Sequence, residues 1–348
     1  MTTSRPERMQ AVQLERNGGP LLVRQIPIPR PGPGEVLIRM AASPINPSDL
    51  FFLTGNYAFQ KPFPVVPGLE GSGTVVDAGK GLVPRMWMGK RVACAAAQTS
   101  DGTWAEYMVT SAMLCFPLPN KLSLEQGAML IVNPMTALSF FDLAKSEKHT
   151  AIVSTAAASA LGRMIARLGR QHGLPVINIV RRQEQVELLE SLGAQYVLNS
   201  LDEGFPDRLH TLAHQLKATL ILDAVGGGLT QQLLDAAPFG GTVLVYSNLS
   251  GEPCIFNAET LIFGDKKVAG FFLSNQAAKK SFIARLWFTQ RVKKLATEAL
   301  QTAVQKKLPL TAVQEALEIY QTNMTAGKVL LVANPAEVPQ TGTTDEGA

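Results

Sequence analysis

The sequence contains little cysteine and no large excess of either charge. Its 348 residues include three cysteines, Cys94, Cys115 and Cys254, which are odd in number and far apart along the chain, so no disulfide framework is predicted. The 32 basic and 28 acidic residues leave a net charge of +4, too small to indicate nucleic-acid binding. No apolar run reaches the roughly 18 residues of a membrane span, and the first ten residues lack the apolar core of a secretory signal. We expect a cytoplasmic protein that binds neither nucleic acid nor membrane.

Histidine is also sparse, and its placement argues against a metal site. Of the four histidines, only His210 and His214 stand four residues apart on a predicted helix. They have no cysteine or third candidate ligand nearby, whereas a catalytic zinc site usually has three protein ligands. We therefore predict no metal and expect hydride-transfer chemistry assisted by side-chain or backbone groups.

The first 120 residues indicate an antiparallel, barrel-like β domain. Apolar or alternating segments such as 21–29 and 35–43 are separated by glycine and proline clusters, as in RPGPGE at 30–35. Near residue 124 the pattern changes, and residues 123–146 have helical periodicity that starts at a serine.

Strands and helices alternate after residue 150. Strands are predicted at 150–155, 175–180, 194–199, 218–227, 241–247 and 267–274, and helices at 160–172, 183–192, 206–217 and 229–237. Units of this length predict an α/β fold with a parallel, doubly wound sheet. The predicted domains are 1–124 (β domain, first part), 125–266 (nucleotide domain), 267–334 (its last strand and the return to the β domain) and 335–348 (a disordered tail). We expect the ligand in a cleft between the two domains.

The segment STAAASALG, residues 154–162, stands where a dinucleotide-binding domain carries its phosphate turn. Only the last glycine of the G-x-G-x-x-G pattern is present, as Gly162. The intervening residues are small, so a pyrophosphate could still approach the backbone N–H groups at the start of the predicted helix. An alanine-rich helix start is the alternative, and the strand–turn–helix context favours the phosphate turn.

Two arginines, Arg181 and Arg182, follow the second predicted strand of this domain, where an NAD site usually has an acidic residue. Guanidinium groups at this corner favour recognition of a 2′-phosphate, and hence NADPH. Ordinary exposed arginines at a helix start are the alternative.

Residues 279–294, KKSFIARLWFTQRVKK, concentrate basic side chains that include Lys279 and Lys280. Apolar residues interleave with them at roughly helical spacing, namely Phe282, Ile283, Leu286, Trp287 and Leu295. One interpretation is an amphipathic helix with a solvated basic face. The other is a docking face for an anionic ligand or carrier.

The two-part β domain, the inserted nucleotide domain and the closing AGKVLL (326–331) together resemble the medium-chain dehydrogenase/reductase superfamily over residues 9–333. The resemblance implies a GroES-like β-barrel catalytic domain with an inserted Rossmann domain. Zinc-dependent members carry a cysteine in the stretch that reads INPSD here (45–49) and Gly-His-Glu in the stretch that reads PGLEG (67–71). Asn46 and Leu69 occupy those ligand positions, which makes the chain similar to the zinc-free, quinone oxidoreductase-like and enoyl reductase-like branch.

Within that branch, NPSDLFFLTGNY (46–57) resembles the mitochondrial-type 2-enoyl thioester reductases. Further similar stretches are GTWAEY (102–107), VNPMTAL (132–138), INIVRR (177–182), SLGAQYVL (191–198) and LIFGDKKVAGFFLSN (261–275). The resemblance implies that Tyr57 is catalytic, donating a hydrogen bond or proton to the enolate that forms when hydride reaches Cβ. It also implies that Asn46 lines the nicotinamide pocket. The alternatives are a loop aromatic packed over the cleft for Tyr57 and a turn-forming residue before Pro47 for Asn46.

The resemblance implies a set of cofactor contacts as well. Asn133 and Thr136 would face the nicotinamide, Ala158, Ser159, Ala160 and Leu161 the pyrophosphate, and Arg181, Arg182 and Gln183 the 2′-phosphate. Tyr246, Ser247, Asn248, Leu249, Phe271, Phe272 and Leu273 would wall the nicotinamide, and Lys328 would reach a phosphate or close the domain interface. Tyr246, Phe271 and Phe272 are equally compatible with a place in the core, because aromatic residues at strand ends are usually buried.

The predicted function is NADPH-dependent reduction of activated carbon–carbon double bonds, with a 2-enoyl thioester of CoA or acyl carrier protein as the substrate. A quinone or enone reductase with the same cofactor is one alternative, and a protein that binds NADPH without turnover is another, since fold does not guarantee chemistry. The resemblance further implies a homodimer formed through the sheet edge near residues 243–274.

Overall fold

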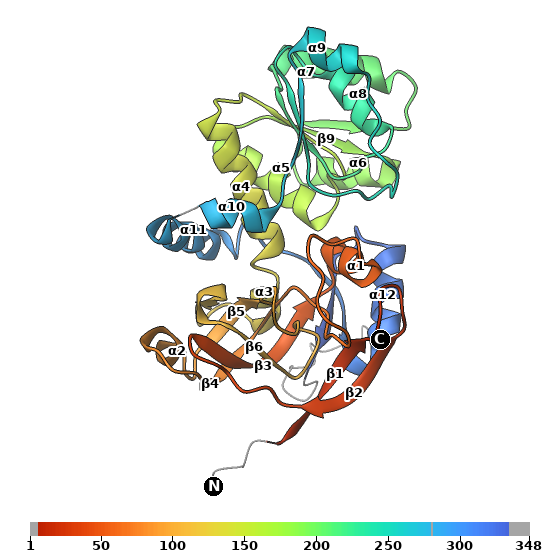
Figure 1. Cartoon of the computed structure of the whole chain (residues 1–348). Coiled ribbons are helices and arrows are strands. Elements are labelled where there is room, and N and C mark those ends of the chain that lie inside the picture. The colour runs from red at the N-terminus through yellow and green to blue at the C-terminus, as the bar shows by residue number, and fades with distance from the viewer. Residues whose placement is uncertain (1–5, 280, 334–348) are drawn as a thin grey trace, which may run out of the picture. The chain divides into compact units, whose positions relative to one another are not determined.

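The computed structural model describes residues 6–279 and 281–333, without the side chains of 277–279, 282–283 and 285–286. Within these residues the chain forms two compact units (Figure 1). Unit 1 comprises 6–129, 304–323 and 328–333, and unit 2 comprises 130–303 and 324–327. The predicted tail at 335–348 and Lys280 lie outside the described residues. The second unit is thus inserted in the first.

Unit 1 is built on strands. β1 (Arg8–Leu14) and β2 (Leu21–Pro27) form an antiparallel pair. A seven-stranded sheet contains β14 (Val304–Pro309), β15 (Lys328–Val332), β3 (Glu35–Pro44), β4 (Glu70–Ala78), β5 (Arg91–Ala95) and β7 (Cys115–Pro117) in that order, with β6 (Tyr107–Ser111) paired to β3. Only β14 and β15 run parallel. Strand β3 is therefore central, because β6 and β15 share one of its edges and β4 takes the other.

The helices of unit 1 are short. They are α1 (Pro47–Thr54), α2 (Leu82–Met86), α3 (Leu124–Ala128) and α12 (Val313–Thr322), with 3₁₀ turns at Ala112–Leu114 and Leu310–Ala312. Trp104, Met108 and the β3 residues Val36, Leu37 and Ile38 are among the fully buried side chains. Consecutive buried residues in β3 indicate that both faces of this strand are covered, and the sequence there is correspondingly apolar rather than alternating.

Unit 2 contains a six-stranded, wholly parallel sheet. Its order is β10 (Tyr196–Asn199), β9 (Val176–Val180), β8 (Ile152–Ser154), β11 (Leu220–Asp223), β12 (Thr242–Val245) and β13 (Lys267–Gly270). The order reverses beside β8, and dinucleotides bind at such switch points in doubly wound sheets. The predicted α/β architecture, a β domain with an inserted Rossmann-type parallel sheet, is confirmed.

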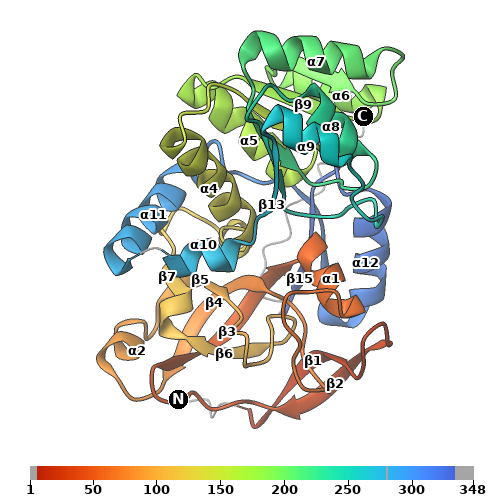
Figure 2. The same ribbon diagram turned by 45° about the horizontal axis from the view of Figure 1, so that its top comes forward.

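The helices of unit 2 are α4 (Val132–Ser146), α5 (Ala160–His172), α6 (Gln183–Ser191), α7 (Phe205–Leu216), α8 (Leu229–Ala236), α9 (Ala258–Gly264), α10 (Leu273–Lys279) and α11 (Phe282–Leu295). Helices α7, α8 and α9 gather on one side of the unit (Figure 2), where Phe205, Leu209 and Leu233 pack against sheet residues such as Ile221. Across the described residues no helix is long and apolar enough to cross a membrane.

Three predicted elements are wrong in part. The helical segment 123–146 is two helices, because Pro134 has no N–H to donate and is tolerated only in the first turn of a new helix, α4. The strand predicted over 267–274 ends at Gly270, and the carbonyl of Phe272 accepts the N–H groups of Asn275 and Gln276 as α10 starts.

The basic segment is also divided, since Ser281 caps a separate helix α11 by accepting a hydrogen bond from the N–H of Ala284. The buried face of α11 includes Phe288, Val292 and Leu295, whereas Trp287, predicted on the apolar face, is 71% exposed. Trp287 lies one residue from Phe288, so it points away from the face that is buried. On the polar side of α11, Arg291 forms an ion pair with Asp142 of α4 (2.5 Å between Nη1 and Oδ1), which uses part of the predicted basic face.

Candidate active site

The segment that leads to Tyr57 begins at a capped helix. Asn46 is the N-cap of α1, its backbone N–H donates to Asp49 Oδ2 (2.8 Å), and Pro47 occupies the first turn, where its missing N–H is not needed. Gly55 ends the helix with φ +83°, and a Cβ there would lie 2.4 Å from Asn17 Nδ2. The chain can therefore turn sharply into Asn56 and Tyr57 only because residue 55 is glycine.

A buried polar cluster surrounds the start of α1. Lys328, from β15, donates its ammonium protons to the carbonyl of Ile45 (3.0 Å), to Asn46 Oδ1 and to the hydroxyl of Tyr320 (3.5 Å). Asn46 in turn donates from Nδ2 to Glu70 Oε1 (2.9 Å). The side chains of Lys328, Asn46, Asp49 and Glu70 are all nearly inaccessible to solvent. One ammonium group thus lies among two carboxyl groups, and its N–H donors are engaged inside unit 1.

Burial dominates the electrostatics of this cluster. Desolvation raises the pKa of Asp49 to about 7, although backbone hydrogen bonds and Lys328 favour the carboxylate. Desolvation also lowers the pKa of Lys328 to about 8, against the attraction of Glu70 and Asp49. Both groups therefore titrate near neutral pH, which marks the cluster as a functional-site candidate.

The residues Phe52, Tyr57 and Phe59 form an aromatic cluster at the end of α1. The ring of Tyr57 stands edge-on to Phe59 (5.0 Å between centroids) and to Phe52 (6.4 Å). Burial, and secondarily Asp49, raises the pKa of the Tyr57 hydroxyl well above its usual range. This hydroxyl is therefore protonated throughout the physiological pH range and can act as a hydrogen-bond donor.

The sequence did not single out Lys61, which lies beside this cluster. Its ammonium lies 5.7 Å from the ring centroids of both Phe52 and Phe59 and donates to the carbonyl of Ser100 (2.5 Å). Desolvation lowers its pKa to about 8. The sequence feature that could have indicated Lys61 is its position four residues after Tyr57 in a largely apolar stretch.

In unit 2, the turn after β8 has the geometry of a phosphate turn. Ala156 has φ +48°, a left-handed conformation that glycine would adopt without strain. Ser159 caps α5, and its hydroxyl accepts the N–H of Gly162 (3.1 Å). A Cβ on Gly162 would lie 2.4 Å from the carbonyl oxygen of Ala157, so this glycine allows the helix to approach the turn closely. Ala158, Ala160 and Leu161 are buried, and their side chains are apolar, so only their backbone carries groups that could hydrogen-bond to a phosphate.

The corner after β9 carries Arg181, Arg182 and Gln183, all of them exposed. Arg182 Nε pairs with Glu184 Oε1 (3.1 Å), and its Nη2 donates to the hydroxyl of Thr325 (3.3 Å). Thr325 belongs to the short 324–327 part of unit 2, and no motif in the sequence predicts this segment beside Arg182. Two guanidinium groups thus stand at the end of the strand that follows the phosphate turn.

Asp223, which sequence reasoning missed, organises the carboxyl ends of β8 and β11. Its Oδ1 accepts from the hydroxyl of Thr155 (3.2 Å) and the N–H of Val225 (2.9 Å), and its Oδ2 accepts from Thr230 (2.8 Å). The Thr155 hydroxyl accepts the N–H of Ala224 (2.8 Å). These bonds join the two strands across the point where the sheet order reverses.

Tyr246 and Phe271 follow β12 and β13, and both pack on Phe140 of α4, with centroid separations of 5.1 and 4.6 Å. The hydroxyl of Tyr246 is buried and has no hydrogen-bond partner among the described residues. Thr136 lies one helical turn before Phe140, on the same face of α4, and is buried. The structure therefore brings Tyr246 and Phe271 together on α4 at Phe140.

The remaining predicted cofactor residues are distributed around these loops. Asn133 lies in the first turn of α4, and Leu273 is the first residue of α10. Loop 246–249 is tied to the β11 loop, since Leu249 N–H donates to the Ala224 carbonyl (3.0 Å). Ser247, Asn248 and Phe272 lie in the loops that follow β12 and β13. Lys328, by contrast, lies in unit 1, buried in the polar cluster described above.

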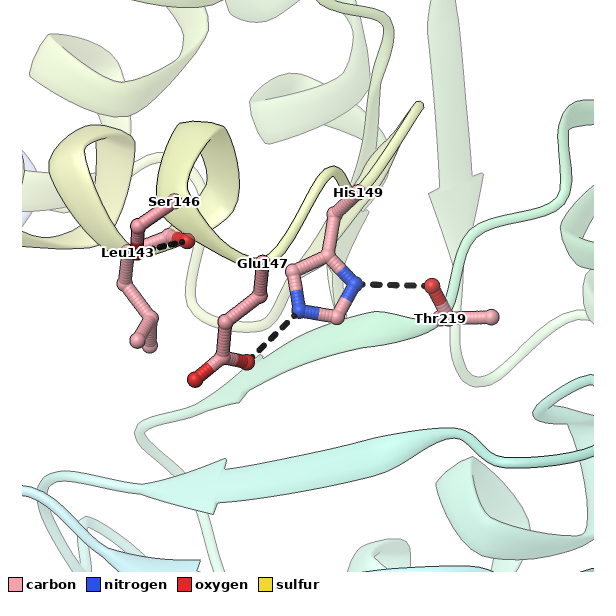
Figure 3. Close-up of polar contacts among 5 residues, drawn as sticks. All are labelled: Leu143, Ser146, Glu147, His149 and Thr219. Carbon is pink, nitrogen blue, oxygen red and sulfur yellow. Dashed lines mark hydrogen bonds and ion pairs between the residues drawn. The ribbon is translucent and has the colours of Figure 1, made fainter.

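The histidines His149, His210 and His214 contact protein side chains. His149 contacts Thr219 Oγ1 through Nδ1 (2.8 Å) and Glu147 Oε2 through Nε2 (3.1 Å), beside a turn in which Ser146 donates to the Leu143 carbonyl (Figure 3). The rings of His210 and His214 stack at 4.2 Å. Within residues 6–279 and 281–333, no group of three or more His, Cys, Asp or Glu side chains is arranged to hold a metal ion.

Comparison with known proteins adds family evidence to this geometry. Residues 32–120 match the alcohol dehydrogenase GroES-like domain family, and residues 160–287 match the zinc-binding dehydrogenase family. The mitochondrial enoyl-acyl-carrier-protein reductase of Caenorhabditis elegans is 32% identical over 89% of this chain and 93% of its own length. The Homo sapiens enzyme of that name is 30% identical over 78% of this chain and 74% of its own length.

Solved structures resemble the chain over almost its whole length. A Mesorhizobium loti protein assigned to the NADPH:quinone reductases is 32% identical, with a TM-score of 0.86 over 95% of this chain and 100% of the other. A Bacillus thuringiensis protein with the same assignment is 28% identical, with a TM-score of 0.83 over 94% of this chain and 99% of the other.

Proposed function

The chain belongs to the medium-chain dehydrogenase/reductase superfamily of oxidoreductases that use a nicotinamide cofactor, and from this premise we propose that it is an NADPH-dependent reductase of 2-enoyl thioesters. The observation that carries the proposal is Tyr57. It is a protonated, half-buried tyrosine held by a capped helix within a stretch that resembles the enoyl thioester reductases. The similarity to enoyl-acyl-carrier-protein reductases over most of their length supports the same substrate class.

The chemistry requires a hydrogen-bond donor that keeps its proton. Reduction of an α,β-unsaturated thioester develops negative charge on the carbonyl oxygen, and a donor aimed at that oxygen lowers the barrier. The hydroxyl of Tyr57 can donate in this way because burial keeps it protonated. Asn46 is held by Lys328 and Glu70, so its orientation is set by the buried cluster of unit 1 and not by solvent.

The residues of unit 2 fit NADPH, which supplies a hydride when bound. The close approach of α5 at Gly162 and the left-handed Ala156 form a turn whose backbone can meet a pyrophosphate. Arg181 and Arg182 provide cations for a 2′-phosphate, and Arg182 would exchange its ion pair with Glu184 for one with that phosphate. The unpartnered hydroxyl of Tyr246 offers a buried donor at the carboxyl end of β12.

The test follows NADPH oxidation with crotonyl-CoA, a longer enoyl-CoA and a simple quinone, with NADH as the control cofactor. We expect turnover of the thioesters, and a kcat at least roughly 100-fold lower for Tyr57→Phe because the proton donor is lost. NADPH affinity of that variant should be unchanged, since Tyr57 lies in unit 1 and the cofactor residues lie in unit 2. NADPH binding without turnover of any substrate would contradict the proposal and favour a non-catalytic binding protein.

A quinone reductase is the second candidate, supported by the similarity to proteins assigned to the NADPH:quinone reductases. In that case Tyr57 would be a wall of the pocket, and Tyr57→Phe would leave quinone reduction nearly unchanged. Turnover of the quinone alone, by both the wild-type protein and Tyr57→Phe, would select this candidate.

The cofactor preference has its own test. Arg181→Ala together with Arg182→Ala should weaken NADPH binding by roughly tenfold or more and leave NADH binding unchanged, because only NADPH carries the 2′-phosphate. Lys145→Ala, which removes an exposed cation from the last turn of α4, is a matched control for the loss of surface charge. Equal weakening for both cofactors would contradict the assignment.

We also propose that the protein is a homodimer joined through unit 2. Strand β13 ends the six-stranded sheet, and exposed apolar side chains accompany it, including Phe239, Ile262 and Phe263. The Gly240 N–H donates to the Gly264 carbonyl (2.9 Å), which brings the loop of Phe239 next to the end of α9. An exposed strand edge beside apolar side chains favours pairing with a second copy.

A further inference from the structure

Two of the three cysteines, for which the sequence predicts no disulfide framework, lie directly opposite each other. Cys94 of β5 and Cys115 of β7 are partners in the antiparallel register of the sheet. Residues directly opposite in an antiparallel pair project from the same face of the sheet. Cys254 lies in unit 2 and is partly exposed.

The hydrogen bonds of this ladder give the geometry of the pair. Leu118 N–H donates to the carbonyl of Arg91 (2.9 Å), which makes Arg91 and Leu118 a hydrogen-bonded pair. Alternation along the ladder then makes Cys94 and Cys115 a non-hydrogen-bonded pair, as it does Val92 and Pro117, where proline has no N–H to lose.

Such pairs have Cα atoms about 4.5 Å apart and side chains at their closest. This separation lies within the roughly 4.4–6.8 Å that a disulfide spans. The Cα separation typical of such a pair is therefore one that a disulfide can bridge.

The surroundings of the two thiols differ. Cys94 is fully buried, and its thiol donates to the carbonyl of Gly71 on β4 (3.4 Å). Cys115 lies on the three-residue strand β7 at the end of the sheet, where it is 7% exposed. A short terminal strand opens more readily than the centre of a sheet. Cys115 is consequently the thiol that a reagent can reach first.

We propose that Cys94 and Cys115 are a redox pair that forms a cross-strand disulfide on reaction with a low-molecular-weight disulfide. Cys115, as its thiolate, attacks the reagent disulfide, forms a mixed disulfide and releases one reagent thiolate. Cys94, as its thiolate, then attacks the Cys115 sulfur, forms the protein disulfide and releases the second thiolate. Two protein thiols lose two protons and two electrons, and the reagent disulfide is reduced to two thiols.

The disulfide would remove one of the hydrogen bonds next to the candidate site. In the reduced protein the Cys94 thiol holds the carbonyl of Gly71, which follows Glu70, the carboxyl group that accepts from Asn46. The disulfide removes this donor and at the same time fixes β7 to β5. Burial raises the pKa of Cys115 to about 12 and that of Cys94 well above its usual range, so oxidation should accelerate as pH rises.

The test incubates the purified full-length protein with glutathione disulfide at several pH values, followed by acid quenching, intact mass measurement and peptide mapping. We expect a product two hydrogen atoms lighter, apart from any glutathione on Cys254, with the peptides of Cys94 and Cys115 linked. Its Tm should be higher than that of the reduced protein by roughly 5 °C, and reduction should reverse the shift.

Cys115→Ser and Cys94→Ala should each abolish the Tm shift, and Cys254→Ala should retain it; two single variants are used so that a folding failure of one leaves the other. A stable mixed disulfide at Cys115 without closure would overturn the proposal. So would modification of Cys254 alone, or a Tm shift that persists in Cys94→Ala.

Discussion

Lys328 is the cation of the buried polar cluster at the start of α1. It contacts Ile45, Asn46 and Tyr320 and supplies the positive charge near Asp49 and Glu70. Its side chain is 3% exposed. Removing one partner from a buried charge cluster leaves the others uncompensated, which costs more than the loss of an exposed ion pair.

Lys328→Met should therefore lower the free energy of unfolding of unit 1 by about 3–5 kcal/mol, measured by urea titration. Lys307→Met is the matched control, because Lys307 lies in the same unit and pairs with Glu125 (2.8 Å) at a partly exposed site. Its loss should cost roughly 1 kcal/mol or less. Equal effects of the two substitutions would contradict the role assigned to Lys328.

Asp49 predicts a dependence of stability on pH. The folded protein keeps a proton on Asp49 up to about pH 7, whereas the unfolded chain releases it near the ordinary value of 3.8. Between these two values the folded state holds a proton that the unfolded state has released, so a rise in pH favours the unfolded state and this contribution to the free energy of unfolding decreases from about pH 4 to pH 7. Asp49→Asn should remove that decrease in urea titrations at successive pH values.

A matched control for this experiment is Asp265→Asn. Asp265 is exposed and has φ +48°, a conformation that asparagine tolerates well. This variant should keep the pH dependence of the wild type. A decrease that survives in Asp49→Asn would assign it to another group.

The turn between β8 and α5 depends on one position where no side chain fits. At Gly162, a Cβ would meet the backbone of Ala157 at 2.4 Å. Gly162→Ala should therefore displace the start of α5 and weaken NADPH binding at least roughly tenfold, measured by fluorescence titration. Gly228→Ala is the control, because Gly228 has φ −67° and open space where a Cβ would lie. The NADPH affinity of this variant should equal that of the wild-type protein.

Local patterns predicted the regular elements of unit 2 well. Helix α5 spans Ala160–His172 as expected, because an apolar stripe, the cap Ser159 and the C-terminal Gly173 agree with one another. The division at Pro134 and the end of β13 were missed, since in both places an apolar run continues while the backbone changes conformation.

Contacts between distant segments could not be predicted. Lys328 contacts Asn46 from the other end of the sequence, Thr325 meets Arg182, and Cys94 faces Cys115 only through the sheet register. No local spacing encodes such pairs. Motifs in the sequence indicated the candidate site residues. Their partners Asp49, Glu70 and Asp223 could be identified only from the folded structure.

The insertion of unit 2 makes the chain pass between the units at four places, near residues 129, 303, 323 and 327. Two arginines of α5 donate hydrogen bonds to backbone carbonyls of unit 2 that lie next to three of these crossing points in the sequence. Arg167 donates to the carbonyls of Ala299 (3.0 Å) and Gln301 (2.6 Å), and Arg163 donates to that of Thr325 (2.9 Å). The helix that starts at the phosphate turn is thus fixed to the ends of its own domain.

If the protein is a homodimer joined through unit 2, a charged residue in the interface should lower its molar mass in solution. Sedimentation equilibrium should show a dimer for the wild-type protein and a monomer for Phe263→Glu, because Phe263 is 79% exposed beside the end strand β13. Leu82→Glu is the control, since Leu82 is 78% exposed but lies in unit 1, and this variant should stay dimeric. A monomeric wild-type protein would contradict the dimer.

The position of β15 has a consequence for synthesis on the ribosome. This strand lies between β14 and β3, yet it is the last strand of the described residues to be translated, and it contains Lys328. Until it emerges, the nascent chain holds Asp49 and Glu70 without their counter-ion, whereas all residues of the parallel sheet have already left the exit tunnel. Unit 2 can therefore fold during translation, and unit 1, although it begins first, is completed last.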